Sequence, residues 1–525
     1  MRNVKNEIMK KFLPVILIFL TSKSFAQVPE DALRYSWYPY SGTARNMAIG
    51  GAMGSLGGDI SAVFINPAGI GFYKTSEFVF TPGFLLNSNK ANYRETITTN
   101  KKNSLSLGAT GIILGSPSAR KPGNSSAFSF AATQTVNFNN TIRYRALNNY
   151  SSFSEQFAEE FAKSGYSISD VLYSNSPMPY SAAPALYTYL IDTTTVNGNS
   201  FIKAAPEYLL DSGYALQQDM NKTTGGGFYD LSFAYAHNTK DKLLWGITLG
   251  IPVVNYKSNT TFTETDTSQN VYNHFKSFTY KDDFTTTGLG FNLKLGAIFK
   301  PSEFFRIGLA VHTPSYMLLT DSRTTSLVTI LEDTAGKTKT YGITSQTFTN
   351  NQPGESKNTQ TSPWKAILSL SYVFREIENV KKQRGFITAD IEYVQHKGSR
   401  FRSDNDNPTA SEKFYYKSLN EVVKQEYKGA FNFRVGGELK FNVIMARLGF
   451  AYYGKPYKDG AFTASQTLIS GGLGYRNHGF FIDLTYVHRS AKDVQFPYRL
   501  EDRLNTYAGI TQKQGNIVAT VGVKF

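Results

Sequence analysis

The chain has 525 residues, no cysteine and an excess of basic side chains that gives a formal net charge of +15. Without cysteine, disulfide scaffolds, cysteine-ligated metal centres and thiol nucleophiles are excluded. Charged residues make up 18% of the chain, fewer than in a typical soluble domain, whereas Phe, Tyr and Trp together make up 14%. No apolar run reaches the roughly 18 residues of a membrane-spanning helix, so a polytopic helical membrane protein is excluded.

The first residues have the pattern of a secretory signal peptide. Two lysines precede the apolar run 12–20, and the small residues Ser24 and Ala26 follow it. A basic segment, a short apolar run and small residues before the cut are typical of such a peptide, so we predict that residues 1–26 are removed. A buried N-terminal helix is the alternative, which the lysines and Pro14 within the run disfavour.

From residue 76 onward, short segments alternate between apolar and polar residues. In the segment 285–299, Leu289, Phe291 and Leu293 share one face, whereas Asn292 points to the other. Side chains of a strand point alternately to its two faces, so this alternation predicts strands. The segments have about 10 to 13 residues, close to the 9–11 of a tilted transmembrane strand, and many apolar faces end in aromatic residues, as an interfacial girdle requires.

These segments predict an all-β fold, a transmembrane antiparallel β-barrel of about 14 strands over residues 76–525. Bacterial single-chain barrels have an even number of strands. The final segment ends on Phe525, which resembles the C-terminal assembly signal of bacterial outer-membrane proteins. The predicted strands are 77–86, 104–114, 125–137, 226–237, 242–256, 285–299, 303–314, 363–375, 385–396, 428–441, 444–454, 466–477, 478–489 and 515–525.

Long polar stretches between these strands are predicted to be extracellular loops, because barrels alternate short periplasmic turns with long outer loops. Within the largest of them, Phe153, Phe157, Ala158 and Phe161 have helical spacing and predict a short amphipathic helix over 151–163. This helix could pack its own loop or collect a ligand. The predicted loops are 138–225, 257–284, 315–362, 397–427 and 490–514.

The N-terminal segment 27–75 is rich in glycine and apolar residues. Six glycines lie between Gly42 and Gly58, which permits tight turns and close approaches of the backbone. The segment is too short to fold alone and too apolar to remain in water. We therefore predict that it is a hatch that plugs the barrel lumen.

The residues Asn66, Pro67, Ala68 and Gly69, which follow this glycine-rich run, give the chain its clearest likeness to a known family. Here it resembles the FadL/TodX-type outer-membrane channels for hydrophobic compounds, and these four residues match that family's hatch motif. The resemblance covers essentially the mature chain, although the extracellular loops cannot be matched. An ordinary Asn-Pro turn is the alternative interpretation of the motif.

The resemblance implies a fourteen-stranded barrel, an N-terminal hatch and a ligand that leaves sideways through an opening in the wall. Asn66 and Pro67 would fix a hatch turn beside that opening. Apolar hatch residues would line the ligand path. These candidate path residues are Met47, Met53, Leu56, Ile60, Val63, Phe64 and Ile65.

The implied function is passive uptake of hydrophobic small molecules, namely long-chain fatty acids or aromatic hydrocarbons, with release gated by the hatch. An apolar chain gains about 0.8 kcal/mol per buried CH₂, so it favours an apolar path over a watery pore. An outer-membrane barrel that binds a protein partner, for example in secretion, is the alternative. A general hydrophilic pore is disfavoured because an apolar plug would close it.

No catalytic motif is present, and no enzyme, cofactor or metal is predicted. The six histidines are scattered without a pair at i, i+4, and Asp390 and Glu392 share one strand face as lumen carboxylates do. The expected location is the outer membrane of a Gram-negative bacterium. The expected partners are a hydrophobic ligand, outer-membrane lipid and lipopolysaccharide, and the barrel assembly machinery, with no nucleic acid and a monomeric chain.

Overall fold

The computed structural model describes residues 31–196, 199–374, 384–459 and 464–525. The predicted signal peptide, 1–26, lies outside these residues. No helix in the described ranges is both long and apolar enough to cross a membrane.

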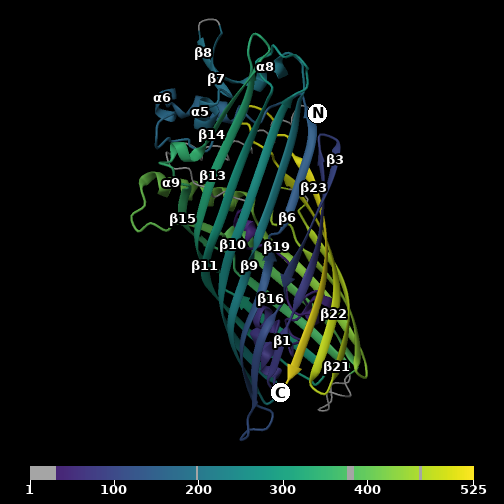
Figure 1. Cartoon of the computed structure of the whole chain (residues 1–525). Helices are drawn as coiled ribbons and strands as arrows, with labels where there is room; N and C mark the ends of the chain where they lie inside the picture. The colour runs from purple at the N-terminus through teal and green to yellow at the C-terminus, as the bar shows by residue number, and fades with distance from the viewer. Residues whose placement is uncertain (1–30, 197–198, 375–383, 460–463) are drawn as a thin grey trace, which may run out of the picture.

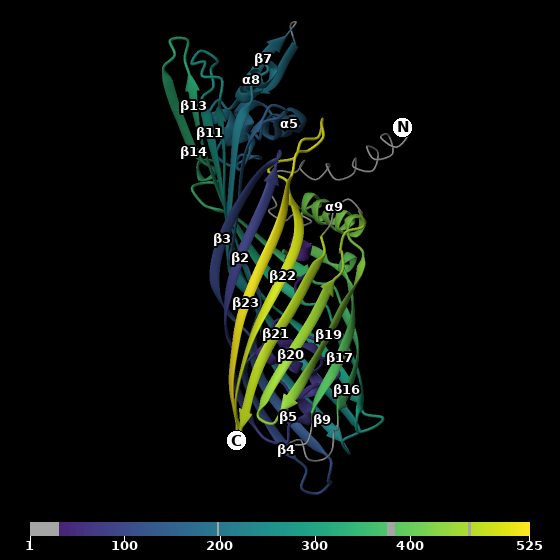
Figure 2. The ribbon, with the colours of Figure 1, turned by 90° about the vertical axis from the view of Figure 1, so that its right-hand side faces the viewer.

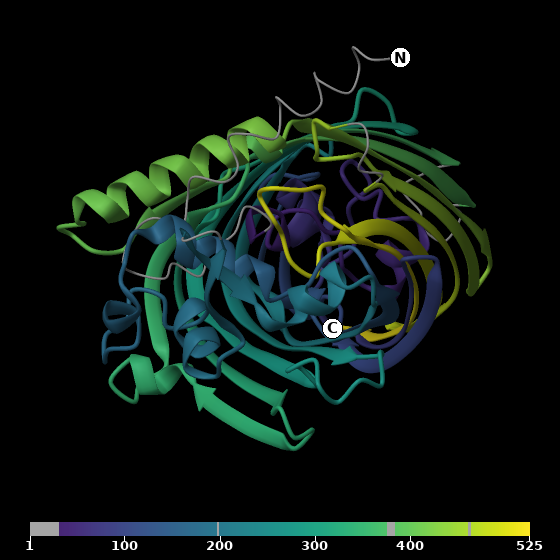
Figure 3. The same ribbon diagram turned by 90° about the horizontal axis from the view of Figure 1, so that it is seen from above.

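Within the described residues, fourteen antiparallel strands close into a barrel (Figure 1), which is seen end-on in Figure 3. Each strand in the ring pairs with the next, and the last pairs back with the first. The ring confirms the predicted all-β barrel, and its members coincide with the fourteen predicted segments. In order they are β1 (Glu77–Phe80), β4 (Thr110–Pro117), β5 (Ser125–Asn137), β9 (Leu216–Thr239), β10 (Leu243–Asp266), β11 (Ser277–Phe299), β12 (Phe305–His312), β16 (Lys365–Phe374), β17 (Gly385–Gln395), β19 (Gly429–Phe441), β20 (Ile444–Tyr453), β21 (Gln466–Asn477), β22 (Phe480–Gln495) and β23 (Ala508–Lys524).

The outer surface of the barrel carries an apolar band. On β10, the outward side chains of Trp245, Ile247 and Leu249 are each between a third and a half exposed, and the outward positions farther along are the polar Asn255 and Lys257. A lipid-facing barrel surface presents such a band, bordered by aromatic and polar residues. The strands continue well beyond it, since β9 and β10 each have 24 residues.

The stretches predicted as loops contain regular structure. Most of their strands extend the barrel wall beyond the apolar band, and one hairpin, 191–204, forms a separate two-stranded sheet. Figure 2 shows the tall end that they build with the short helices. The strand over 354–361 is polar on both faces, so apolar alternation could not reveal it. The strands within the predicted loops are β6 (Asn140–Asn148), β7 (Ile191–Val196), β8 (Asn199–Ala204), β13 (Tyr316–Glu332), β14 (Thr338–Thr344), β15 (Gly354–Thr361) and β18 (Arg400–Ser403). Two further strands, β2 (Pro82–Tyr93) and β3 (Thr96–Leu107), overlap the predicted strands 77–86 and 104–114 and join them through a hairpin.

The helices between residues 155 and 211 lie at this tall end (Figure 1) and, with the strand ends that they pack on, are called the cap below. Helix α5 begins at Glu155 rather than at the predicted residue 151, and Phe157, Ala158 and Phe161 are buried. They belong to a large apolar cluster with β-strand residues such as Phe262, so the helix contributes its apolar face to the core of the cap. The helices of the structure are α2 (Asp31–Arg34), α3 (Ala44–Ala48), α4 (Ala62–Ile65), η2 (Pro67–Phe72), α5 (Glu155–Ser164), α6 (Ile168–Val171), α7 (Ala182–Tyr187), α8 (Ala205–Asp211), η3 (Ser345–Phe348), η5 (His396–Gly398) and α9 (Ala410–Glu426).

The N-terminal segment lies inside the barrel. Its elements α3, α4 and η2 fill the end opposite the cap, whereas α2 lies higher and packs against α9. Wall hydroxyls bind its backbone: Thr520 accepts from the Ala44 amide at 2.7 Å, and Thr485 donates to the Ala44 carbonyl at 2.7 Å. Ser470 donates to the Ala48 carbonyl at 3.0 Å. Side chains from distant strands therefore satisfy the short plug helices, whose own ends leave backbone groups unpaired.

Paired wall glycines make room for this plug. Gly436 on β19 lies opposite Gly449 on β20, and a Cβ at either position would clash with the plug backbone at Ile49 or Gly50. Gly50 has a φ of +68°, a left-handed conformation that glycine adopts at little cost. The plug can therefore turn directly against the wall, and a side chain on the wall glycines would push it away.

We predict that Gly449→Ala destabilises the barrel by about 1–3 kcal/mol, because the new methyl group overpacks the contact with Gly50. The measurement is unfolding by urea, followed by loss of β-sheet circular dichroism. Gly509→Ala on β23 is the matched control, since a Cβ there meets no heavy atom within 4 Å. Equal midpoints for the two variants would contradict the close contact.

Candidate hatch and wall interruption

Asn66 joins the plug to the barrel wall. Its Nδ2 donates to the Gly54 carbonyl at 2.5 Å within the plug and to the Ala297 carbonyl of β11 at 3.2 Å. Its Oδ1 accepts from the Ala68 amide at 3.2 Å and so caps η2, which begins at Pro67. A Cβ at Gly296 would clash with the Asn66 side chain, so this wall glycine is part of the asparagine's site.

The other two motif residues complete a buried turn. Ala68 is fully buried, and the Gly69 carbonyl accepts a hydrogen bond from the Gly58 amide at 3.0 Å. Pro67 lies against Gly246 of β10. The structure thus brings the four predicted motif residues together at one corner of the plug, against β10, β11 and β12.

The predicted path residues lie between the plug and the wall. All except the half-buried Met47 are almost completely buried. Met53, Leu56 and Ile65 share one apolar cluster with wall residues, and Ile60, Val63 and Phe64 share another. Met47 packs against a third, around Tyr453. These side chains form the apolar contact that seats the plug.

A buried charge cluster also holds the plug. The guanidinium of Arg434 on β19 lies 3.4 Å from carboxylate oxygens of both Asp390 and Glu392 on β17, and none of the three side chains is more than 2% exposed. Asp390 accepts from the plug amide of Gly54 at 3.1 Å, and Glu392 accepts from the Tyr40 hydroxyl at 2.6 Å. The two carboxylates noted in the sequence therefore lie together and bind plug groups.

The barrel wall is interrupted in one region. The ladder between β4 and β5 ends at Thr110 and Ala132, and beyond it β3 pairs with β2 while β6 pairs with β9. Across the described strands, no ladder joins β3 to β5 or β6. This region, bordered by 98–109 on one side and 133–147 on the other, is called the wall interruption below.

Amide side chains bridge the wall interruption. Asn137 donates to the Leu105 carbonyl at 2.7 Å, and Asn100 donates to the Arg143 carbonyl at 3.0 Å. Asn89 similarly donates to the Thr141 carbonyl at 2.7 Å. Backbone carbonyls that would otherwise lack partners are thereby satisfied, as buried or lipid-facing groups require.

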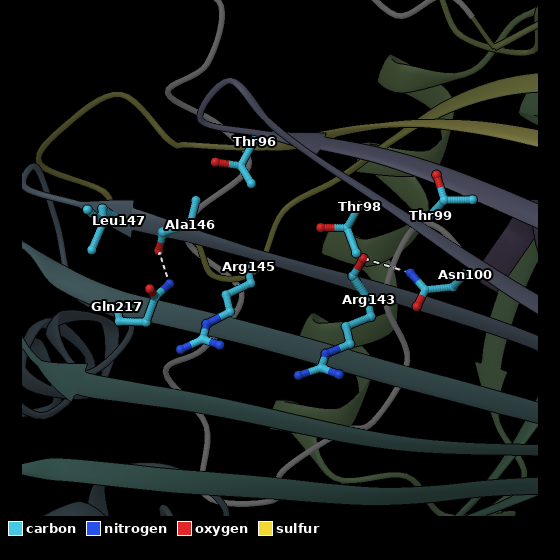
Figure 4. Close-up of a pocket in the computed structure, with 9 residues that line it drawn as sticks. All are labelled: Thr96, Thr98, Thr99, Asn100, Arg143, Arg145, Ala146, Leu147 and Gln217. Atoms are coloured by element: carbon cyan, nitrogen blue, oxygen red, sulfur yellow. Dashed lines mark hydrogen bonds between the residues drawn. The ribbon is translucent and has the colours of Figure 1, made fainter.

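A pocket of about 640 Å³ opens in the outer part of the wall interruption (Figure 4). Figure 4 shows the bond from Asn100 to the Arg143 carbonyl and the bond from Gln217 to the Ala146 carbonyl, 2.9 Å long. The lining combines hydroxyl, amide and guanidinium groups. The residues are Thr96, Thr98, Thr99, Asn100, Arg143, Arg145, Ala146, Leu147 and Gln217.

An aromatic surface lies inside the barrel beside the wall interruption. Phe138 directly follows β5, and its ring lies 5.1 Å from that of Tyr256 and 6.1 Å from that of Tyr35, between centroids. These rings belong to an apolar cluster that also contains Phe228 and Met317. The lumen therefore presents apolar side chains at the position where the wall ladder is missing.

The hatch motif does not border the wall interruption. Gly296, which contacts Asn66, lies in the same register row as Ala127 on β5, when paired residues are followed from β11 through β10 and β9. Thr133, at the edge of the wall interruption, is six residues farther along β5, or about 20 Å. The plug instead reaches the interruption through Ser41, whose hydroxyl accepts from Thr133 at 3.3 Å, and Gly42, which packs on Gly108.

Sequence reasoning did not identify the wall interruption. The one available signal was the cluster of amides at Gln134, Asn137, Asn139 and Asn140, where apolar alternation ends. Among the described residues, no group of three or more His, Asp or Glu side chains is arranged to hold a metal ion.

The cap contains a buried carboxylate, Glu264, well beyond the apolar band. It accepts hydrogen bonds from the Phe153 amide and the Gln218 side chain, both at 2.7 Å, and from the Ser152 hydroxyl. Burial raises the pKa of Glu264 to about 7, and these hydrogen bonds offset only part of that shift. The folded cap therefore holds a proton that the unfolded cap releases at a lower pH.

No protein-family model matches the chain, and no curated protein sequence matches it. Solved structures do share its fold. One is a FadL homologue of Pseudomonas aeruginosa, with a TM-score of 0.51 and 12% identity over 93% of this chain and 100% of that one. Another is the P. putida toluene transporter TodX, with a TM-score of 0.50 and 12% identity over 93% of this chain and 99% of that one. At this identity the similarity shows the fold.

We predict that Arg434→Met costs about 3–5 kcal/mol of unfolding free energy, because it leaves Asp390 and Glu392 buried without their counter-charge. Urea unfolding measures the loss. The control is Lys74→Met, which breaks an ion pair with Asp241 that is about half exposed and should cost about 1 kcal/mol or less. Adding Asp390→Asn and Glu392→Gln to Arg434→Met should recover much of the loss, and no recovery would contradict the electrostatic cause.

We predict that Glu264 by itself lowers the stability of the cap by about 3 kcal/mol as pH rises from 4.5 to 7. The pKa of Glu264 is above its ordinary value of 4.5 in the folded state, so folding binds a proton in this range and becomes less favourable as that proton is lost. Hydrogen exchange of residues 149–164, corrected for intrinsic rates, measures the change. Glu264→Gln should reduce the dependence by this amount and leave the part due to Glu155 on α5, whose pKa burial raises to about 8. Glu421→Gln, at an exposed site on α9, should leave the dependence unchanged.

Proposed function

We propose that this chain is an outer-membrane channel for the passive uptake of hydrophobic small molecules, long-chain fatty acids or aromatic hydrocarbons. The observation that carries the proposal is the wall interruption, which is bridged by amide side chains and has an aromatic surface on its lumen side. The likeness in fold to the toluene transporter TodX and to a FadL homologue supports it.

The proposed route enters at the cap end, follows the aromatic surface around Phe138 and leaves sideways through the wall interruption. Each buried CH₂ contributes about 0.8 kcal/mol, so a ligand that passes from this surface directly into lipid avoids a second exposure to water. Straight passage is disfavoured because the plug is held by the Arg434 cluster and by wall hydrogen bonds.

The hatch is proposed to gate this release. Asn66, Pro67, Ala68 and Gly69 would anchor it to β10, β11 and β12, and the plug end at Ser41 and Gly42 would seal the interruption from inside. When the hatch shifts, its apolar contact with the wall would line the path. The residues of that contact are Met47, Met53, Leu56, Ile60, Val63, Phe64 and Ile65.

The remaining assignments are also proposals. Residues 1–26 would direct export, 27–75 would form the hatch and 76–525 the barrel with its extracellular extensions. Phe525 would be read by the barrel assembly machinery of a Gram-negative bacterium, and the chain would act as a monomer. No catalytic activity is proposed, in keeping with the likeness in fold to the toluene transporter TodX.

The test is a crosslink across the wall interruption. The chain has no cysteine, so Ser104→Cys/Asn137→Cys introduces a single thiol pair, at side chains whose oxygens lie 3.4 Å apart. Oxidation should lower the uptake of radiolabelled oleate and toluene by cells to the level of a strain without the protein. A reductant should restore uptake.

The matched control is Thr263→Cys/Thr279→Cys, a pair 3.1 Å apart within the continuous ladder of β10 and β11. Its oxidation should leave uptake unchanged. Full uptake by the crosslinked interruption would rule out the side route. Absence of any hydrophobe uptake by the folded wild-type barrel would instead favour a barrel that binds a protein partner.

A further inference from the structure

Four lysines form a regular pattern on the outer face of β22, β23, β2 and β3, which lie side by side in Figure 2. In one register row, Lys513 and Lys101 alternate with serines; in the next row, Lys492 and Lys90 alternate with threonines. All four lysines are exposed. The patch, called the lysine lattice below, contains the rows Ser490, Lys513, Ser88, Lys101 and Lys492, Thr511, Lys90, Thr99.

The lysine lattice has no internal counter-charge. Neither row contains a carboxylate, and no ion pair to any of the four lysines is found among the described residues. Diagonal neighbours across strands lie about 7–8 Å apart, so the ammonium groups repel one another. By contrast, the outward lysines Lys257 on β10 and Lys281 on β11 have a carboxylate beside them. Asp283 on β11 is diagonal to Lys257 and two residues from Lys281.

Apolar side chains lie beneath the lysine lattice on the same four strands. The register row Tyr486, Ile517, Phe84 and Leu105 is entirely apolar, and each of its side chains is at least 40% exposed. The first lysine row follows four residues farther along each strand, or about 14 Å. The wall therefore presents an apolar surface and, above it, cations interleaved with hydroxyl donors.

We propose that the lysine lattice is a docking site for lipopolysaccharide, with its acyl chains on the apolar rows and its phosphates on the lysines and hydroxyls. The inference rests on the proposed location of the chain in an outer membrane. Phosphate oxygens accept charge-assisted hydrogen bonds from ammonium groups, and the four lysines offer several such donors to the two phosphates of one amphiphile.

The lysine lattice continues to the wall interruption. Thr99, opposite Lys90, lines the pocket with Arg143 and Arg145. Arg143 forms an ion pair with Asp219 at 2.7 Å. A lipid bound to the lysine lattice would thus lie beside the proposed exit, and its acyl chains would form the apolar surface next to that exit.

The experiment measures binding of purified lipopolysaccharide to the full-length barrel in detergent, by titration. Each basic residue near an anionic lipid surface contributes about fivefold in affinity. Lys101→Gln/Lys513→Gln should therefore weaken binding about 25-fold, and added salt should reduce the difference. Lys257→Gln/Lys281→Gln removes the same charge elsewhere on the barrel and should change binding little.

Two further ligands identify the chemistry. Dephosphorylated lipopolysaccharide should bind wild type and the lattice variant equally weakly, and inorganic phosphate should compete only at high concentration. Equal affinity of the lattice and control variants would overturn the site, and equal binding of phosphorylated and dephosphorylated lipid would overturn the phosphate contact. Stronger binding of phosphatidylglycerol vesicles would overturn lipopolysaccharide as the occupant.

The same variants separate this inference from the proposed function. Uptake of oleate and toluene is measured in cells that express each variant, with folding checked by the heat-dependent shift of the barrel on a gel. Loss of lipid binding with wild-type uptake would leave the channel intact. Wild-type lipid binding without any uptake would leave the lysine lattice intact and remove the channel.

Discussion

The structure depends on the requirement that every backbone amide and carbonyl in the wall finds a partner. Around most of the ring, a continuous antiparallel ladder meets it, since lipid supplies no hydrogen bonds. At the wall interruption the ladder is absent, and side-chain amides such as Asn137 and Asn100 meet it instead. A side-chain amide can rotate away from its carbonyl acceptor without separating two paired strands. The free-energy cost of opening is therefore lower here than in the rest of the wall.

The same requirement explains how the plug is held. Its helices are too short to pair their own backbone groups, so hydroxyls of the wall at Thr485, Ser470 and Thr520 supply the partners. The Arg434 cluster adds charges that are costly to separate once buried. Removing the plug would break these contacts together, whereas opening the wall interruption breaks a few amide bonds. The relative costs favour opening of the wall interruption, with a local shift of the plug end at Ser41 and Gly42, over removal of the whole plug.

The sequence predicted the barrel because alternation is a local property. Leu289, Phe291 and Leu293 reveal the face of their strand without reference to any other strand. Among the strands beyond the apolar band, β15 was missed because its residues are polar on both faces. The helix predicted over 151–163 is present as α5, although it begins four residues later, at Glu155. It could be predicted because helical apolar spacing is also a local property.

The candidate site depended on contacts that no local pattern contains. Asn66 was recognisable from its motif, but its place against Gly296 follows from the register of β11 in the closed ring. The wall interruption is likewise a property of pairing, since β5 and β6 alternate much as other strands do. Only the amides at 134–140 differ from their surroundings, and amides occur in many loops.

The position of the wall interruption follows from the solvent on the outside of the barrel. Its lower part, from Ala109 to Leu105, lies beside apolar rows of the outer surface. Above Leu105 comes one mixed row, and the next two rows carry lysines, serines and threonines. In the hydrocarbon layer an unpaired carbonyl costs several kcal/mol, but at the headgroups water can replace a lost amide bond. An opening here therefore has lipid at its lower edge to receive an apolar ligand and water at its upper edge to satisfy the exposed backbone.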